Sequence, residues 1–207
     1  KDKGISFKPT NDLSQFECFV DADFAGNYTK ENCEDPNSVK SRTGCVIKYA
    51  GCPITWFSRL QSEIALSTTE AEYIALSMGA REVLPLREMI TELKPILNLP
   101  KTKLVIRCTL FEDNMGAEEL ANVPKNRPRT KHIAVKYHHV REAVNNSFLT
   151  VKRVDTTNQL ADIFTKPLAK TPLEYLRYSI MGWTAMLSHG NIQSDIFQAV
   201  RKTSIGH

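Results

Sequence analysis

Four acidic residues stand at points of the sequence where predicted strands and helices meet. Asp21 ends the first predicted strand, and Asp113 lies where the fourth gives way to a helix. Glu72 lies in the first turns of a capped helix, and Asp162 lies in the helix that follows the last strand. If strands one and four are neighbours in a sheet, Asp21 and Asp113 meet, and helices packed on that sheet can add the other two acids. Carboxylates gathered in this way repel one another and need a cation to be tolerated.

The cation that suits such a cluster is a hard divalent ion. Magnesium is bound by oxygen ligands and often shares its site with substrate phosphates. Two such ions, about 3.5–4 Å apart, can clamp the attacking and leaving oxygens of a phosphodiester. The spacing therefore indicates metal-dependent cleavage of a nucleic acid, with ordinary surface acids as the alternative.

Positive charge is concentrated in one segment, residues 124–141. The whole chain has 27 basic and 23 acidic residues, a net charge of +4. The segment holds six basic residues and no acid, so the rest of the chain carries a net charge of −2. A basic segment on a nearly neutral body indicates contact with a polyanion such as a nucleic-acid backbone. A solvated basic loop and helix face would give the same composition.

The elements that would position these residues follow one another in a mixed series. Three early strands, at 16–23, 43–49 and 53–58, are joined by a loop and a turn and predict an antiparallel meander. Later strands are predicted at 103–111 and 148–154. Helices are predicted at 114–122, 133–144, 158–165 and 173–180. From residue 182 onward the sequence shows little periodicity.

The clearest helix signal begins at Ser67. Residues 67–70 fit a capping box, in which Ser67 caps the helix and Glu70 reaches back to the backbone N–H of Ser67. Glu70 and Glu72 lie about 200° apart around a helix and cannot share a face, which leaves Glu72 for a metal. Pro85 is expected to kink this helix or to divide it from residues 86–93, because proline lacks the N–H that the turn needs.

Length and composition are those of one globular domain of moderate size with a tail. Of the 207 residues, 42% are hydrophobic and 24% are charged, which excludes collagen, coiled coils, disulfide-rich mini-proteins and wholesale disorder. No uncharged stretch approaches the roughly 20 residues of a membrane span, so no membrane partner is expected. The five irregularly spaced cysteines are typical of a reduced intracellular protein. A chain that begins at Lys1 without a signal peptide is expected to be a piece of a longer polypeptide.

Several short blocks, taken in order, carry a family resemblance. Those in the first half are Phe19–Gly26, Ser41–Gly44, Ile54–Trp56 and Ala65–Tyr73. Those in the second half are Glu112–Asn114, Arg129–Ile133, Tyr137–His138 and Gln159–Leu168. Over about residues 1–168 the sequence resembles the ribonuclease H domain of copia-type LTR retrotransposon Pol polyproteins.

The resemblance implies a fold, a division of the chain and an activity. The fold would be an RNase H-like α/β fold, with a five-stranded mixed sheet made of the antiparallel three-strand meander plus parallel strands and flanked by helices. The chain would comprise a linker from the preceding polymerase region (1–15), the RNase H-like domain (16–168) and a C-terminal helical extension or tail (169–207). The activity would be endonucleolytic hydrolysis of the RNA strand of RNA/DNA hybrids during reverse transcription, leaving 5′-phosphate ends.

The resemblance also implies the catalytic ligands. The family's four catalytic, metal-binding carboxylates match Asp21, Glu72, Asp113 and Asp162. Two Mg²⁺ ions are expected there, with Mn²⁺ as a substitute, one activating the attacking water and the other stabilising the departing 3′ oxygen. The motif selects Asp113 over its neighbour Glu112, which would point the opposite way if the strand persisted to that point.

Contacts with the substrate are expected from the basic segment. The expected contacts with nucleic-acid phosphates are Arg129, Lys131, His132, Lys136 and Arg141. The implied partners are the RNA/DNA hybrid and the polymerase region of the same polyprotein, in cytoplasmic virus-like particles. The alternative is a catalytically weak or inactive RNase H-like module that binds nucleic acid for a reverse transcriptase. The presence of all four carboxylates argues against that alternative.

Overall fold

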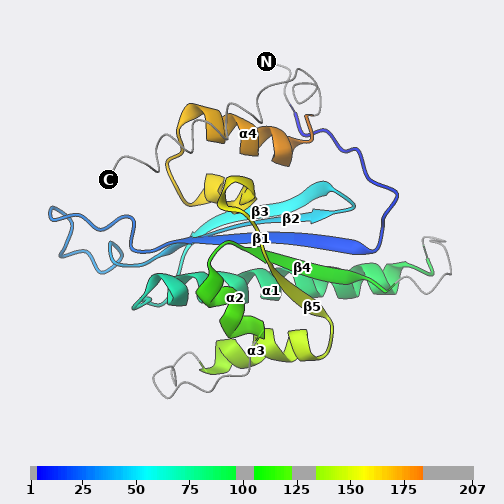
Figure 1. Cartoon of the computed structure of the whole chain (residues 1–207), viewed down its shortest axis with the longest axis horizontal. Coiled ribbons are helices and arrows are strands. Elements are labelled where there is room, and N and C mark those ends of the chain that lie inside the picture. Colours follow the sequence, from blue (N-terminus) through cyan, green and yellow to red (C-terminus); the bar gives the residue numbers. More distant parts are fainter. Residues whose placement is uncertain (1–3, 97–104, 123–133, 184–207) are drawn as a thin grey trace.

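A five-stranded mixed sheet forms the centre of the molecule (Figure 1). The computed structural model describes residues 4–96, 105–122 and 134–183. The strands are β1 (Gln15–Asp23), β2 (Arg42–Tyr49), β3 (Cys52–Leu60), β4 (Arg107–Glu112) and β5 (Leu149–Arg153). In the order β3-β2-β1-β4-β5, the first three strands pair antiparallel, β4 pairs parallel with β1, and β5 pairs parallel with β4. The predicted sheet, a meander plus parallel strands, is confirmed.

The register of the central strands brings two of the predicted acids to one level. β1 pairs with β4 in parallel, with Phe19 opposite Phe111. Continued by two residues, the same offset places Asp21 level with Asp113, where both strands reach their carboxyl ends. The first and fourth strands are therefore neighbours, which was the condition for these two acids to meet.

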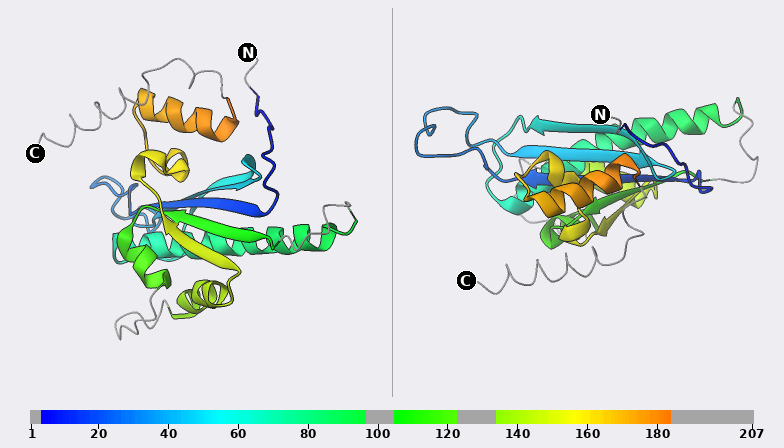
Figure 2. Two further views of the ribbon diagram at one scale, coloured as in Figure 1. Left: turned by 45° about the vertical axis from the view of Figure 1, so that its right-hand side comes forward. Right: turned by 90° about the horizontal axis from the view of Figure 1, so that it is seen from above.

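Helices cover both faces of this sheet (Figure 2). They are α1 (Thr68–Leu93), α2 (Met115–Asn122), α3 (Ala134–Asn145), α4 (Lys170–Met181) and the short 3₁₀ helices η2 (Thr156–Asn158) and η3 (Leu160–Phe164). Helices α1, α2 and α3 lie on one face, and η3 and α4 lie on the other. None of the described helices combines the length and the apolar composition needed to cross a membrane.

Two hydrophobic cores hold these layers together. The larger core, between the sheet and α1, includes Phe16, Val20, Tyr73, Leu76 and Leu110. The smaller core, under η3 and α4, includes Phe19, Val46, Leu160, Leu176 and Ile180. Because successive strand residues point to opposite faces, Phe19 and Val20 belong to different cores. β1 is thus buried on both sides, which keeps its carboxyl end in a fixed position.

Helix α1 packs closely against β1 at Gly79. A Cβ atom added to this glycine would lie 2.5 Å from Val20 Cγ1 and 3.1 Å from Cys18 Sγ, so a side chain would have to displace its neighbours. This close approach lies about two helical turns after Glu72. The close packing at Gly79 therefore helps to determine how near the side chain of Glu72 lies to the carboxyl end of β1.

The course of α1 differs from the prediction at Pro85. The helix is continuous over 26 residues, and Pro85 lies inside it. The predicted division of the helix at Pro85 is therefore wrong, and the other predicted outcome, a kink, stays a prediction. Pro85 lies on the exposed side of α1. Because proline has no N–H, the carbonyl group one turn earlier lacks its helical hydrogen-bond donor, and on this exposed side it can bond to water instead.

The segment that carries Asp162 also differs from the prediction. One helix was expected over 158–165, and the structure has two 3₁₀ helices, η2 and η3, separated by Gln159. The backbone of Gln159 is extended, its side-chain Nε2 donates to the Val20 carbonyl at 2.8 Å, and its Oε1 accepts the N–H of Ala161 at 3.3 Å. This buried amide interrupts the helix and ties η3 to β1.

Two further boundaries moved by a few residues. β4 begins at Arg107 instead of 103, and residues 103 and 104 of the predicted strand lie outside the described part of the chain. α4 begins at Lys170 instead of 173. The remaining predicted strands and helices lie within three residues of their expected bounds.

Candidate metal centre

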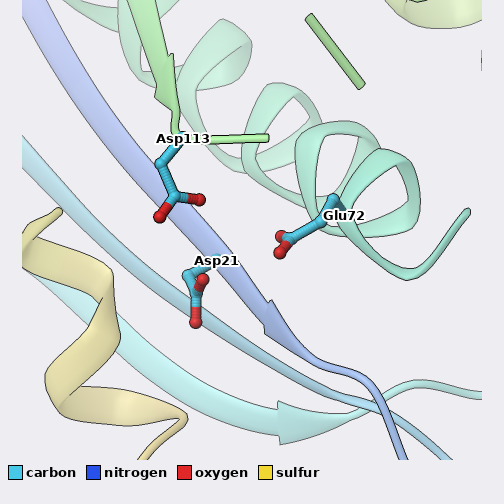
Figure 3. Close-up of side chains that lie close together, drawn as sticks. All are labelled: Asp21, Glu72 and Asp113. Atoms are coloured by element: carbon cyan, nitrogen blue, oxygen red, sulfur yellow. The ribbon is translucent and has the colours of Figure 1, made fainter. Parts of the chain in front are cut away.

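Three carboxylates meet at the carboxyl end of β1. Asp21 comes from β1, Glu72 from the first turns of α1, and Asp113 from the residue that follows β4. One oxygen of each lies within 4.8 Å of the oxygens of the other two. Figure 3 shows the three side chains directed toward a common space. Three of the four predicted acids are thus brought together by three separate elements.

Asp21 is held by the residues that follow η3. Its side chain is fully buried, and its Oδ1 accepts a hydrogen bond from Lys166 Nζ at 2.9 Å. Its Oδ2 accepts a hydrogen bond from the Thr165 hydroxyl. Both carboxylate oxygens therefore have partners, and the side chain is fixed in orientation.

Glu72 is held from the opposite side by the backbone of β1. Its Oε2 accepts the N–H of Ala22 at 2.7 Å. Burial raises the pKa of Glu72 to about 9, and the charges of Asp21 and Asp113 add to this effect. Near neutral pH and without a cation, Glu72 therefore carries a proton. A bound cation would favour its charged form.

Glu70 has the structural role that helix geometry assigned to it. Ser67 Oγ accepts the N–H of Glu70 at 3.1 Å and so caps α1. Glu70 Oε2 accepts the N–H of Leu66 at 2.9 Å, one residue before the N–H that was predicted. Glu70 thus closes the start of the helix, and Glu72, two residues later, faces the sheet.

Asp162 lies beside this cluster and is joined to it by a lysine. Asp162 is the third residue of η3, and its Oδ1 accepts a hydrogen bond from Lys166 Nζ at 2.8 Å. The same ammonium group bonds to Asp21, so it bridges the two acids. Burial and the charge of Asp21 raise the pKa of Asp162 to about 6, against the opposing effect of Lys166.

Sequence reasoning missed Lys166 as part of this arrangement. Burial alone would lower the pKa of its ammonium group, but Asp21 and Asp162 outweigh that effect and raise the pKa above its ordinary value. A signal existed, because Lys166 follows Asp162 by four residues and its N–H bonds to the Asp162 carbonyl at 3.0 Å, as in one turn of an α-helix. The predicted helix ended at 165, one residue too early to reveal the pair.

Sequence reasoning also set Glu112 aside. This residue ends β4 and is fully buried, and its Oε1 accepts the N–H of Asn114 at 3.0 Å. Its Oε2 has no hydrogen-bond partner among the described residues. Burial, followed by the nearby charge of Glu72, raises the pKa of Glu112 well above its ordinary value. Burial therefore disfavours the charged form of Glu112 next to the three-carboxylate cluster.

The predicted nucleic-acid contacts lie largely outside the described residues. Arg129, Lys131 and His132 fall in the undescribed range 123–133, and the side chain of Lys136 is also outside the described part. Arg141 lies in α3, where its Nε donates to the Leu120 carbonyl of α2 at 3.0 Å. The substrate-binding role of these residues stays a prediction.

The donor set fits a hard divalent cation. Asp21, Glu72 and Asp113 offer carboxylate oxygens, which are the ligands that Mg²⁺ and Mn²⁺ take in proteins. Asp21 lies on β1, Glu72 lies on α1 and Asp113 directly follows β4, so a cation bound between them would join these three parts of the fold. The arrangement can therefore hold a metal ion at the end of the central strands.

The chain is similar to part of the Pol polyproteins of plant transposons. It is 36% identical over 156 residues to the retrovirus-related Pol polyprotein from transposon TNT 1-94 of Nicotiana tabacum, an alignment that covers 75% of this chain and 10% of the relative. It is 36% identical over 171 residues to that from transposon RE1 of Arabidopsis thaliana, covering 83% and 11%. The chain spans about a tenth of the length of these relatives. No family model matches the sequence.

Solved structures similar to this chain are RNase H domains of low sequence identity. The N-terminal RNase H domain of a Mycobacterium tuberculosis protein has a TM-score of 0.47 and 12% identity, covering 80% of this chain and 98% of that one. RNase H1 from Halobacterium salinarum has a TM-score of 0.46 and 15% identity, covering 73% and 94%.

Proposed function

This chain belongs to the retrovirus-related Pol polyproteins of transposons, and on that premise we propose that it is their RNase H-type endonuclease. The proposed reaction is hydrolysis of the RNA strand of an RNA/DNA hybrid during reverse transcription, leaving 5′-phosphate and 3′-hydroxyl ends. The observation that supports this most strongly is the convergence of Asp21, Glu72 and Asp113 on one space. The polymerase region of the same polyprotein is the proposed partner, in cytoplasmic virus-like particles.

Divalent ions would be held by the four acids named above. Asp21, Glu72 and Asp113 would hold one ion, and Asp21 with Asp162 would hold a second, with Mg²⁺ as the proposed ion and Mn²⁺ as a substitute. When bound, such ions activate a water molecule and stabilise the charge that develops on the departing oxygen.

The protein itself keeps the ligands in place before a substrate arrives. Thr165 holds one oxygen of Asp21, and the N–H of Ala22 holds one oxygen of Glu72 at 2.7 Å. Because these bonds are already formed, the carboxylates need little rearrangement when charge develops at the phosphate. This is the preorganisation that a phosphodiesterase requires.

Substrate binding is assigned to the basic segment 124–141. The residues proposed to contact phosphates are Arg129, Lys131, His132, Lys136 and Arg141. Each phosphate that a lysine or arginine neutralises adds to the salt dependence of binding. Selection of the RNA strand would depend on its 2′-hydroxyl groups in the minor groove of the hybrid.

The experiment that tests this function is cleavage of an RNA/DNA hybrid labelled at the end of each strand. Wild-type protein in Mg²⁺ is compared with the same protein in EDTA, with Asp113→Asn and with Glu119→Gln. Glu119 is an exposed acid of α2 and serves as the matched control. We expect cleavage of the RNA strand alone, lost in EDTA, reduced roughly 100-fold or more in Asp113→Asn, and unchanged in Glu119→Gln.

Two results would overturn the proposal in different ways. Full activity of Asp113→Asn would remove the role of the carboxylate cluster. Salt-sensitive binding of the hybrid by the wild type without cleavage, both alone and with the polymerase region attached, would favour the non-catalytic binding module instead.

A further inference from the structure

One ammonium group lies between two acids of the candidate metal centre. Lys166 Nζ lies 2.9 Å from Asp21 Oδ1 and 2.8 Å from Asp162 Oδ1. The exposed fractions of the Asp21 and Asp162 side chains are 0% and 8%, whereas that of Lys166 is 36%. Two buried acids are thus paired with one cation that reaches them from the solvent side.

The need for a cation at this position follows from charge. Two carboxylates that are buried side by side repel each other, and removing a partner from a buried ion pair leaves an uncompensated charge. In the described structure the positive charge between these two acids comes from Lys166. The cluster of Asp21, Glu72 and Asp113 has no comparable bridging lysine among the ion pairs of the described residues, and Asp162 is not part of that cluster.

The centre therefore has two unequal positions for positive charge. One is surrounded by three carboxylates, and the other, between Asp21 and Asp162, is taken by the ammonium group. Thr165 separately fixes the second oxygen of Asp21, so this acid does not depend on Lys166 alone for its orientation. Movement of the lysine would leave Asp21 in place.

We propose that Lys166 is a positioning residue that holds the second cation position of the free protein and must leave it before a second divalent ion binds. This inference rests on the proposed metal-dependent function. The free protein then binds one divalent ion through Asp21, Glu72 and Asp113, and a second ion exchanges with the ammonium group. Because the side chain of Lys166 is partly exposed, the displaced ammonium group can turn to solvent, where a phosphate is a suitable partner.

The first test counts Mn²⁺ ions bound to the free protein, by isothermal titration calorimetry and electron paramagnetic resonance. Wild type is compared with Lys166→Gln and with Lys170→Gln, an exposed lysine of α4 that gives the same change in net charge. We expect the second Mn²⁺ to bind about tenfold or more tightly to Lys166→Gln than to wild type, because a positive charge close to the ion has been removed. Lys170→Gln should bind like wild type.

Two controls separate this role from a merely structural one. Lys166→Arg keeps the positive charge and should keep the weak second binding step, provided that it unfolds at the temperature of the wild type. In wild-type protein, the NMR signal of the Lys166 ε-CH₂ group should move during the second equivalent of Mg²⁺ and not during the first. This measurement needs no substitution and holds even if Lys166→Gln fails to fold.

The outcomes distinguish this inference from the proposed function. Unchanged binding of the second Mn²⁺ in Lys166→Gln, or a Lys166 signal that never moves, would overturn the exchange while leaving metal-dependent cleavage intact. Absence of any divalent-ion binding by wild type would overturn both. Tighter second binding in Lys170→Gln to the same degree would show a general effect of net charge and would also overturn the exchange.

Discussion

At the scale of single residues, Glu72 links the candidate metal centre to the pH dependence of folding. Burial raises its pKa to about 9 from an ordinary value of 4.5, so between these values the folded chain keeps a proton that the unfolded chain has lost. Where the folded state binds more protons, the free energy of unfolding decreases as pH rises. Asp162 acts in the same direction between 3.8 and about 6. The raised pKa of Lys166 adds a stabilisation that is constant over this range.

We therefore predict that, in EDTA, the protein is less stable at pH 8 than at pH 5.5, by about 3–4 kcal/mol from Glu72 alone, since the change spans about 2.5 pH units at about 1.4 kcal/mol each. Urea unfolding at the two pH values measures this difference. In Glu72→Gln the share of Glu72 should disappear, because the amide can still accept the N–H of Ala22 but does not titrate, and the share of Glu112, whose pKa burial also raises, should remain. Glu70→Gln, the matched control two residues earlier, should keep it. An increase in the free energy of unfolding with pH in EDTA would contradict the raised pKa of Glu72.

The single residues also show what the sequence could predict about the centre. Asp21, Glu72 and Asp113 were predictable because each stands at the end of a strand or the start of a helix, where strand order decides their neighbours. Lys166 was not, because a long side chain can reach in several directions and the pattern of apolar residues says nothing about which acid it bonds. The burial of Glu112 was hidden for a related reason, since charged residues are rarely expected in a core.

At the scale of elements, Gln159 determines where η3 lies. Its amide bonds to the Val20 carbonyl at 2.8 Å in the interior, so η3, and with it Asp162, is tied to β1. We predict that Gln159→Ala lowers the free energy of unfolding by about 1–3 kcal/mol, because a buried carbonyl loses its partner. Cleavage of the hybrid should also fall, since Asp162 and Lys166 lose their support.

Urea unfolding and the hybrid cleavage assay check this prediction together. Thr156→Ala, an exposed position of η2, is the matched control and should change neither quantity by much. Wild-type stability of Gln159→Ala would mean that η3 is held in place by its apolar contacts alone.

The elements also show where local sequence patterns fail. Apolar spacing predicted one helix over 158–165, but a buried glutamine that bonds to a distant strand divides it, and no local pattern records that partner. Pro85 was expected to kink α1 or to divide it, yet the packing of residues on both sides of it against the sheet keeps the helix undivided. In both places a contact far away in sequence outweighs the local preference.

At the scale of the whole molecule, the candidate metal centre is built from three parts of the chain. Asp21, Glu72 and Asp113 lie on β1, on α1 and after β4, so a cation bound to all three would stabilise the folded state and not the unfolded one. At a Mg²⁺ concentration of 100 times Kd, binding adds about 2.7 kcal/mol to the free energy of unfolding. We therefore predict that Mg²⁺ at this concentration and pH 8 raises the midpoint of thermal unfolding by roughly 5–10 °C relative to EDTA.

Differential scanning calorimetry measures this shift. Asp113→Asn should lose most of the response to Mg²⁺ while unfolding near the wild-type temperature in EDTA. Glu119→Gln should respond like wild type. An equal response of all three proteins would place the stabilising ion elsewhere on the molecule.

The whole molecule also shows the reach and the limits of the sequence prediction. The mixed sheet with parallel strands was predicted from the family resemblance, and the pairing of the first strand with the fourth was posed as the condition under which Asp21 and Asp113 meet. The division of the buried residues into two cores on opposite faces of the sheet was not predicted, because a central strand that is buried on both faces shows no alternation of apolar and polar residues. The basic segment 124–141 lies mostly outside the described residues, so its role remains as the sequence predicted it.

The parallel pairing of β1 with β4 has a consequence for synthesis on the ribosome. Asp21 and Asp113 lie 92 positions apart, which at about 5–20 residues per second corresponds to roughly 5–20 s of translation. During that interval β1, β2 and β3 can pair with one another, but the edge of β1 that later receives β4 is open. Thr165 and Lys166, which hold Asp21, are made later still. A nascent or truncated chain therefore carries no assembled centre, and any nuclease activity is withheld until this part of the polyprotein has been synthesised.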